Sequence, residues 1–362
     1  MSSDHPFDPQ GFIVAIVGGT GAVGREMIAI LAERGFPAKK VIPLASHRSV
    51  GQQISYGDEA TLTAQDLATY DFAGTDIVLS SAGANVSKTF APRATEAGAV
   101  VIDNTSLFRM EPDVPLVVPE VNPGAIADYH KRGIIANGNC STIPLSLALA
   151  PLHKLVPIRR VVVATYQSVS GSGKGAMDEL FEQTRAVYVN DTMKKSFMTK
   201  QIAFNVIPHI DVFLDDGQTK EEWKMQSEIR KILSPDIALI ATCVRVPVFI
   251  SHASAITIEF TGPIDLKDAR RALENAPGVS VFDKREDGGY VTPIDCAGED
   301  DVYISRLRVD PSCENGLALW CVSDNLRKGA ALNSVQIAEL LARDHLKTPA
   351  HLQDKKPSAQ LA

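Results

Sequence analysis

The 362-residue sequence has few of the features that mark secreted, membrane-spanning or nucleic-acid-binding proteins. No apolar run approaches the roughly 18 residues that a membrane-spanning helix needs, and the opening MSSDHPFDPQ lacks the basic start and apolar stretch of a signal peptide. The five cysteines are widely spaced and form no CxxC pair, which argues against a disulfide framework and a zinc site. Lys and Arg number 36 against 43 Asp and Glu, so no basic excess would attract nucleic acid or an anionic membrane. We therefore expect a cytoplasmic protein that acts on small molecules, with no metal.

The first part of the chain alternates short apolar runs with helical patterns. Strands are expected at Phe12–Val17, Val41–Leu44, Ile77–Ser80, Val100–Asp103, Leu116–Val118 and Ile134–Ala136. Helices are expected at Ala22–Arg34 and Lys88–Ala97. Short buried strands separated by helices predict a Rossmann-like, doubly wound α/β domain with a parallel sheet, which we place at residues 1–139.

The second part has longer strands that are rich in β-branched residues. They are expected at Arg159–Ser168, Val244–Ser251 and Ala255–Phe260, with helices at Gly175–Tyr188 and Glu221–Leu233. This pattern predicts an α+β domain with a mixed or antiparallel sheet over residues 140–324. A strand at Leu317–Ser323 leads into a helix at Leu326–Ala342, expected to pack back on the first domain within residues 325–346, before a polar tail at 347–362.

A glycine-rich loop follows the first expected strand directly. Gly18, Gly21 and Gly24 form a GxxGxxG pattern at a strand-to-helix turn. Glycines permit close backbone approach, and the helix N-terminus offers N–H groups to a pyrophosphate, so the loop predicts dinucleotide binding. The alternative is an ordinary tight turn, which the position after the first strand disfavours.

The end of the second expected strand suggests which dinucleotide binds. The sequence there reads ASHRSVG, with Arg48 between Ser46 and Ser49, where an NAD enzyme would place an acidic residue. A cation flanked by hydroxyls suits a 2′-phosphate and therefore favours NADP. An ordinary polar loop is the alternative.

Cys140 is the candidate nucleophile. It lies in a Gly/Asn turn between a strand and an apolar helix expected at Ile143–Leu152. The dipole and backbone N–H groups of a helix N-terminus stabilise a thiolate. The alternative, a small buried hydrophobe, is our interpretation of the other four cysteines.

A charged helix is expected further along the chain. Thr219 and Glu222 fit a capping box that begins a helix and places Glu221, Lys224 and Glu228 on one face. The plain alternative is a solvated Glu–Lys pair, and periodicity does not decide between the two.

Several segments, in order and across nearly the whole chain, carry a family resemblance. They are VGGTGAVG, ASHRSVG, DNTSLFRM, NGNCSTI, TYQSVSGSGKGAMDEL, EEWKMQSEIRKIL, RVPVFISHA and SDNLRKGAALNSVQIAELL. The ordered set resembles aspartate-β-semialdehyde dehydrogenase. The resemblance implies NADPH-dependent reductive dephosphorylation of L-aspartyl-4-phosphate to L-aspartate-4-semialdehyde and phosphate, in lysine, methionine and threonine biosynthesis. It also implies an NADP-binding first domain, a catalytic and dimerisation second domain, and a homodimer or dimer of dimers.

The resemblance also implies roles for single residues. The catalytic residues would be Cys140 as the nucleophile, His252 as the general acid/base and Gln167, which positions the acyl group. The substrate-binding residues would be Arg245 for the α-carboxylate, Glu221 for the α-amino group, and Arg109, Asn139 and Lys224 for the phosphate. The cofactor-binding residues would be Gly18, Thr20, Gly21, Ala22, Val23 and Gly24 at the pyrophosphate, Ser46, Arg48 and Ser49 at the 2′-phosphate, and Gly171, Gly173 and Asn325 near the nicotinamide.

The expected mechanism begins with a Cys140 thiolate beside a protonated His252. Three rivals remain open. N-acetyl-γ-glutamyl-phosphate reductase uses similar chemistry on an acetylated amine, for which the carboxylate of Glu221 would be a liability. A non-catalytic dinucleotide-binding paralogue would have lost the Cys or the His. A reductase of coenzyme A esters would need room for a pantetheine arm.

Overall fold

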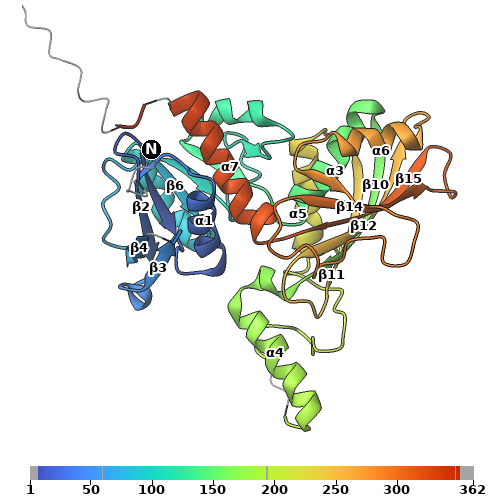
Figure 1. Cartoon of the computed structure of the whole chain (residues 1–362), viewed down its shortest axis with the longest axis horizontal. Coiled ribbons are helices and arrows are strands. Elements are labelled where there is room, and N and C mark those ends of the chain that lie inside the picture. The colour runs from blue at the N-terminus through green and yellow to red at the C-terminus, as the bar shows by residue number, and fades with distance from the viewer. Residues whose placement is uncertain (1–6, 59, 193–194, 347, 351–362) are drawn as a thin grey trace, which may run out of the picture. The chain divides into compact units, whose positions relative to one another are not determined.

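The computed structural model describes residues 7–58, 60–192, 195–346 and 348–350 (Figure 1). The chain divides into two compact units, one containing residues up to 119, 123–137 and those from 331 onward, the other containing 120–122 and 138–330. The predicted functional boundaries at 139/140 and 324/325 stay predictions. Of the predicted polar tail at 347–362, all but residues 348–350 lie outside the described residues.

The first unit contains a seven-stranded, wholly parallel sheet in the order β5-β2-β1-β6-β7-β9-β8. Its strands are β1 (Phe12–Val17), β2 (Ala38–Ala45), β5 (Gln65–Asp66), β6 (Ile77–Ser80), β7 (Val100–Asp103), β8 (Leu116–Val117) and β9 (Ile134–Asn137). A separate hairpin is formed by β3 (Gln53–Tyr56) and β4 (Ala60–Thr63). The helices are α1 (Ala22–Glu33), α2 (Ala84–Glu96) and α7 (Leu332–Leu340). The strand order changes direction beside β1, where doubly wound folds bind their ligands, so the predicted fold class is confirmed.

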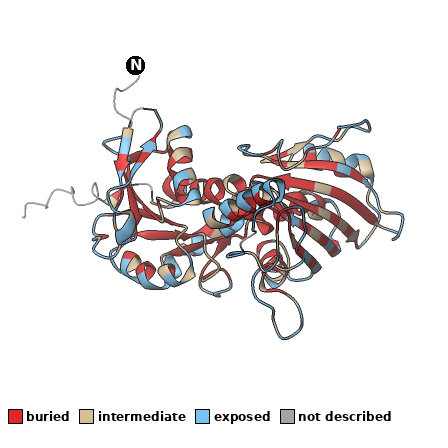
Figure 2. Ribbon diagram, turned by 90° about the horizontal axis from the view of Figure 1, so that it is seen from below, coloured by how far each residue is buried: buried red, intermediate tan, exposed pale blue. Residues whose placement is uncertain are grey.

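The apolar core of this unit joins its two ends. Met27 and Leu31 of α1 are fully buried in the same cluster as Val335 and Ile337 of α7. The predicted return of the C-terminal helix to the first domain is therefore confirmed. Figure 2 shows the strands coloured mainly as buried, as expected for parallel strands covered on both faces.

The second unit contains a six-stranded mixed sheet in the order β11-β10-β12-β15-β14-β13. Its strands are β10 (Ile158–Gln167), β11 (Ala238–Arg245), β12 (His252–Phe260), β13 (Val279–Val281), β14 (Val302–Val309) and β15 (Gly316–Ser323). Its helices are α3 (Thr142–Leu155), α4 (Lys174–Val189), α5 (Lys220–Ile232) and α6 (Leu266–Glu274). Helices α3, α5 and α6 pack against the sheet and one another.

Three neighbouring strands, β10, β11 and β12, place one end each at the same end of this sheet. Strands β10 and β11 are parallel, and their last residues, Gln167 and Arg245, are partners in the register. Strand β12 runs antiparallel to β10, so its first residue, His252, lies at the same edge. Residues far apart in the sequence are thereby brought together.

The predicted helix at Lys88–Ala97 begins later than the observed α2, which begins at Ala84, and two other predicted elements differ more from the structure. The strand predicted at Val244–Ser251 is wrong beyond Arg245, because β11 covers Ala238–Arg245 and residues 246–251 form a loop that contains Pro247, which lacks a backbone donor. The helix predicted at Leu326–Ala342 is not one regular α-helix, because π-helical turns at Arg327–Ala331 and Leu341–Leu346 flank α7.

The glycine loop generates a stability prediction. A Cβ atom at Gly24 would lie 2.2 Å from the carbonyl oxygen of Gly18, so the α1 backbone packs against the loop only without a side chain. Gly24→Ala should lower the free energy of unfolding by about 1–3 kcal/mol, as expected for an overpacked site. Urea denaturation measures this. In the control, Gly124→Ala in the same unit, the added Cβ would meet nothing within 4 Å; equal effects of the two substitutions would contradict the prediction.

Candidate active site

The second unit brings Cys140 and His252 together. Cys140 lies just before α3, and its Sγ is 3.3 Å from Nε2 of His252 at the start of β12. His252 is buried, whereas Cys140 is half-buried and therefore accessible. A cysteine at a helix N-terminus beside an imidazole has the placement of a nucleophile.

The turn that carries Cys140 is fixed on both sides. The backbone N–H of Asn139 donates to Oε2 of Glu228 over 2.7 Å, and Oδ1 of Asn139 accepts from the backbone N–H of Ser141 over 2.8 Å. All three residues are buried. These bonds hold the residues on either side of Cys140.

A buried carboxylate, Glu221, lies at the centre of the site. It accepts from Nδ2 of Asn139 at 2.9 Å, Nε2 of Gln167 at 3.1 Å and Nζ of Lys224 at 3.1 Å. Burial opposes ionisation, but the charge of Lys224 and the hydrogen bonds outweigh it and hold the pKa of Glu221 below its ordinary value. Glu221 is therefore anionic at neutral pH, as recognition of an ammonium requires.

Lys224 is held between two carboxylates. Its Nζ donates to Oδ2 of Asp211 at 2.6 Å as well as to Glu221. Burial alone would lower the pKa of Lys224, but the two negative charges outweigh burial and raise it. The predicted capping box of Thr219 and Glu222 is confirmed at the start of this helix, α5.

Arg245 is the second cation of the site, and it is buried. Its Nη1 donates to the carbonyl oxygen of Ser168 at 2.6 Å, and its Nη2 donates to Oγ of Ser172 at 3.0 Å. A Cβ atom at Gly171 would lie 3.4 Å from Nε2 of His252 and 3.5 Å from Nη1 of Arg245. Gly171 therefore lies directly against both side chains.

The imidazole of His252 is neutral in this arrangement. Burial and then the charge of Arg245 lower its pKa to about 3, although Glu221 acts in the opposite direction. A pKa this low favours a neutral ring, whereas the mechanism expected from the resemblance begins with a protonated His252.

The other predicted phosphate-binding residue, Arg109, belongs to the first unit. Its guanidinium is buried, with Nε donating to the carbonyl oxygen of Asn137 at 2.8 Å and Nη2 to that of Asn104 at 2.9 Å. Asn139 and Lys224 belong to the second unit, where both contact Glu221.

The predicted cofactor residues also belong to both units. In the first unit, Gly18 has a positive φ of 83°, Gly21 precedes α1, and no side chain caps that helix. The first-turn N–H groups of α1, which have no acceptor within the helix, fit a pyrophosphate. Thr20, Ala22, Val23 and Gly24 complete this turn, and Ser46, Arg48 and Ser49 lie at a short 3₁₀ turn directly after β2.

In the second unit, Gly173 precedes α4 with a positive φ of 84°. Asn325 is buried, and its Oδ1 accepts from Oγ of Ser168 and of Ser170, both at 3.1 Å. Asn325 therefore contacts serine side chains in the segment that directly follows β10.

Several residues of the site were not assigned by sequence reasoning, among them Ser141, Ser168, Asp211 and Glu228. Glu228 had a signal, because it shares a helix face with Glu221 and Lys224. The two serines had none, because their contacts bridge residues far apart in the sequence.

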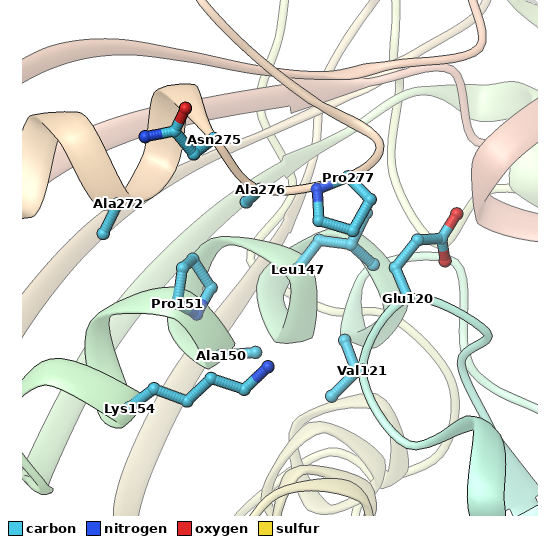
Figure 3. Close-up of a pocket in the computed structure, with 10 residues that line it drawn as sticks. All are labelled: Glu120, Val121, Leu147, Ala150, Pro151, Lys154, Ala272, Asn275, Ala276 and Pro277. Carbon is cyan, nitrogen blue, oxygen red and sulfur yellow. The ribbon is translucent and has the colours of Figure 1, made fainter.

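A cavity of about 250 Å³ lies elsewhere in the second unit (Figure 3). Its wall includes Leu147 and Pro151 of α3 and Glu120, whose carboxylate binds Nζ of Lys328 at 2.7 and 2.9 Å. None of the described residues that line it is a predicted site residue.

Across the part of the chain that the structure describes, no cluster of metal-ligating side chains is found. Within the same residues, no helix has the length and apolarity to cross a membrane.

Comparisons with known proteins find two matching family models and several similar proteins. Residues 13–129 match the family described as semialdehyde dehydrogenase, NAD binding domain, and residues 149–328 match semialdehyde dehydrogenase, dimerisation domain. The aspartate-semialdehyde dehydrogenase of Aquifex aeolicus is 50% identical over 93% of this chain and 100% of its own length. The solved structure of Vibrio cholerae aspartate semialdehyde dehydrogenase II complexed with ASA is 48% identical, covers 93% of this chain and 99% of its own, and has a TM-score of 0.91. The Candida albicans enzyme solved with NADP is 25% identical, covers 91% and 98%, and has a TM-score of 0.69.

The buried His252 generates a pH prediction. Between its unfolded pKa of about 6.5 and its folded pKa of about 3, the unfolded chain binds a proton that the folded chain does not. Stability contributed by the neutral ring is therefore present above pH 6.5 and lost as pH falls, by at most about 1.4 kcal/mol per unit. When the free energy of unfolding is measured by urea denaturation at several pH values in this range, it should depend less steeply on pH in His252→Gln than in the wild type. The control is His47→Gln, whose side chain is 94% exposed; an unchanged slope in His252→Gln would refute the prediction.

Proposed function

The chain belongs to the aspartate-semialdehyde dehydrogenase family, and we propose that it forms L-aspartate-4-semialdehyde from L-aspartyl-4-phosphate and NADPH through a thioester on Cys140. The activity of the family interconverts these two aspartate derivatives, with release of phosphate in the biosynthetic direction. The observation that carries the proposal is the contact of 3.3 Å between Cys140 Sγ and His252 Nε2, in a site that holds both a buried anion and a buried cation.

The two opposite charges suit an amino-acid substrate. Arg245 has two N–H groups engaged by Ser168 and Ser172, which fix its plane and leave other donors for a bidentate bond to the α-carboxylate. Glu221 is ionised and accepts the α-ammonium. An acetylated amine carries no positive charge, so it would offer this buried carboxylate nothing beyond the charge of Lys224, which disfavours the N-acetylglutamyl rival.

The phosphate is assigned to Lys224, Asn139 and Arg109. Nζ of Lys224 carries three N–H groups, of which Glu221 and Asp211 accept two. The third is offered to a phosphate oxygen. Gln167 is assigned to position the acyl group, and its bonds from Nε2 to Oγ of Ser141 at 2.7 Å and to Glu221 at 3.1 Å fix the amide beside the turn that carries Cys140.

The cofactor is assigned to NADP. The open N-terminus of α1 suits its pyrophosphate, and Arg48 with Ser46 and Ser49 suits its 2′-phosphate. Gly171, which lies against His252, offers a surface without a side chain for the nicotinamide. When bound, NADPH supplies the hydride that reduces the thioester.

We also propose a cytoplasmic location, because all five cysteines are free thiols.

We propose that the chain forms a homodimer, or a dimer of dimers, through the outer face of the six-stranded sheet of the second unit. Val162 of β10 and Ile240 of β11 are partners in the register and are 37% and 54% exposed, while the alternate residues Val161 and Leu239 face the helices and are buried. An apolar sheet face of this kind favours a second copy of the chain.

The nucleophile assignment is tested in the reverse reaction. With L-aspartate-4-semialdehyde and phosphate, the wild type should reduce NADP⁺, and Cys140→Ala should lose this activity by several orders of magnitude, because no thioester forms. NADP⁺ binding, measured by calorimetry, should persist in the variant. Retained turnover in Cys140→Ala would overturn the mechanism.

The same assay separates the rival functions. Turnover of N-acetylglutamate semialdehyde alone would support the first rival, and turnover that requires coenzyme A in place of phosphate would support the ester reductase. NADP⁺ binding without any turnover would support a non-catalytic protein.

The dimer face gives a further prediction. Ile240→Asp should raise the dimer dissociation constant by about tenfold or more, because association would bury an unpaired carboxylate. Sedimentation velocity measures this. Ile294→Asp introduces the same charge at a side chain that is 84% exposed and lies outside the sheet; equal weakening by both substitutions would argue against this face.

A further inference from the structure

Lys224 lies closer to Asp211 than to Glu221. Its Nζ donates to Oδ2 of Asp211 at 2.6 Å and to Oε2 of Glu221 at 3.1 Å. Lys224 and Glu221 are neighbours on one face of α5, whereas Asp211 comes from the segment that precedes this helix. The ammonium therefore has a second carboxylate partner in addition to the one that its own helix provides.

The charges of these three groups do not cancel. Burial opposes ionisation of Asp211, but the hydrogen bond and the charge of Lys224 outweigh burial and hold the pKa of Asp211 below its ordinary value. Glu221 is ionised as well, so two negative charges face one positive charge and one net negative charge remains. Without Asp211, the charge of Lys224 would neutralise Glu221 alone, and the pair would carry no net charge.

We propose that Asp211 is a positioning residue that sets substrate specificity: it supplies the counter-charge of Lys224, so that the charge of Glu221 stays available to the α-ammonium of the substrate. This inference deepens the proposed function and rests on it for the identity of the substrate. Asp211 acts through Lys224 and is not a catalytic residue.

The segment that carries Asp211 is anchored at both ends. At one end, the backbones of Ile207 and Arg245 exchange two hydrogen bonds of 2.9 and 2.8 Å. At the other end, the backbone N–H of Lys220, the first residue of α5, donates to the carbonyl oxygen of Val212 at 2.8 Å. The segment therefore connects the residue assigned to the α-carboxylate with the helix that binds the α-ammonium.

The backbone of Asp211 adopts a strained conformation. Its φ is 69°, in the left-handed region that is uncommon for a residue with a side chain. Aspartate and asparagine tolerate this region best, because their short polar side chains form local hydrogen bonds. Here Oδ1 of Asp211 accepts from the backbone N–H of Val212 at 2.9 Å, while Oδ2 accepts from Lys224. Strained residues cluster at functional sites, which supports a role for this carboxylate.

The other charged groups around this cluster have different partners. Glu228 accepts from the backbone N–H of Asn139 at 2.7 Å, and Arg245 is assigned to the α-carboxylate. Lys220 adds positive charge near Asp211 and favours its ionised form. Each charge of the proposed substrate then has a partner, with the α-ammonium on Glu221 and the phosphate on Lys224.

The expected consequence is a preference for a substrate with an α-ammonium. Succinate semialdehyde is the matched probe, because it is L-aspartate-4-semialdehyde without the α-amino group. In Asp211→Asn the amide oxygen can still accept from Lys224, but the three groups carry no net charge. The ratio of kcat/KM for L-aspartate-4-semialdehyde to that for succinate semialdehyde should therefore fall roughly threefold to tenfold. Solvent moderates the effect, because the side chain of Asp211 is 31% exposed, against 7% for Glu221.

The KM for phosphate in the same reverse reaction distinguishes this role from one of aiming Lys224. Removal of a negative charge beside Lys224 leaves its attraction for phosphate intact or stronger, so the KM for phosphate should stay unchanged or fall in Asp211→Asn. A misdirected ammonium would raise it. A raised KM for phosphate together with an unchanged ratio for the two aldehydes would overturn the proposal.

Two further variants complete the test. Asp211→Gly suits the positive φ and also removes the carboxylate, so it should lower the ratio as Asp211→Asn does. Asp215→Asn removes the same charge from an exposed turn of the same segment and should leave the ratio unchanged. An unchanged ratio in both Asp211 variants, or an equal fall in Asp215→Asn, would refute the proposal.

Failure of the proposed function has a different signature. It would appear as a wild type without phosphate-dependent NADP⁺ reduction, and it would remove this inference as well. If succinate semialdehyde is not turned over, its inhibition constant against L-aspartate-4-semialdehyde replaces its kcat/KM in the comparison.

Discussion

The buried carboxylate of Glu221 is the charge around which the polar groups of the second unit are arranged. An ionised carboxylate taken out of water costs several kcal/mol unless it is paired and hydrogen-bonded. Lys224, Asn139 and Gln167 satisfy it from α5, the nucleophile turn and the end of β10. The bonds that stabilise this charge therefore also fix the positions of the groups that surround Cys140.

Helix α5 determines which carboxylates face the turn that carries Cys140. Glu221 accepts from the side chain of Asn139, and Glu228, two turns later on the same face, accepts from its backbone N–H. The capping box of Thr219 and Glu222 determines where the helix begins and hence which side chains point inward. A local signal at the helix N-terminus thus governs contacts with a turn, at separations of 82 and 89 residues along the chain.

Sequence reasoning was strongest where the signal is local. The bounds of β1 and the capping box follow from residues that are neighbours in the chain, and they were predicted correctly. The strand predicted at Val244–Ser251 failed because an apolar, β-branched run resembles a strand even where Pro247 prevents pairing. The hydrogen bond of 3.0 Å from the backbone N–H of Ser168 to Nδ1 of His252 had no signal in the sequence. It uses a backbone group that nearly every residue possesses, and it joins residues that are 84 positions apart. A family resemblance identifies side chains, but not the backbone groups that contact them.

Strand β10 serves two purposes with alternate residues. Gln167 points into the site and is buried, whereas its neighbour Tyr166 lies on the outer face and contacts the ring of Trp320. Side chains alternate along a strand with a period of two residues, so one inserted or deleted residue exchanges the faces. Such a change in β10 would remove the amide from the reaction centre and the aromatic ring from the outer surface at once. Over evolution, single side chains of β10 can therefore be exchanged, whereas an inserted or deleted residue would disrupt both faces of the strand.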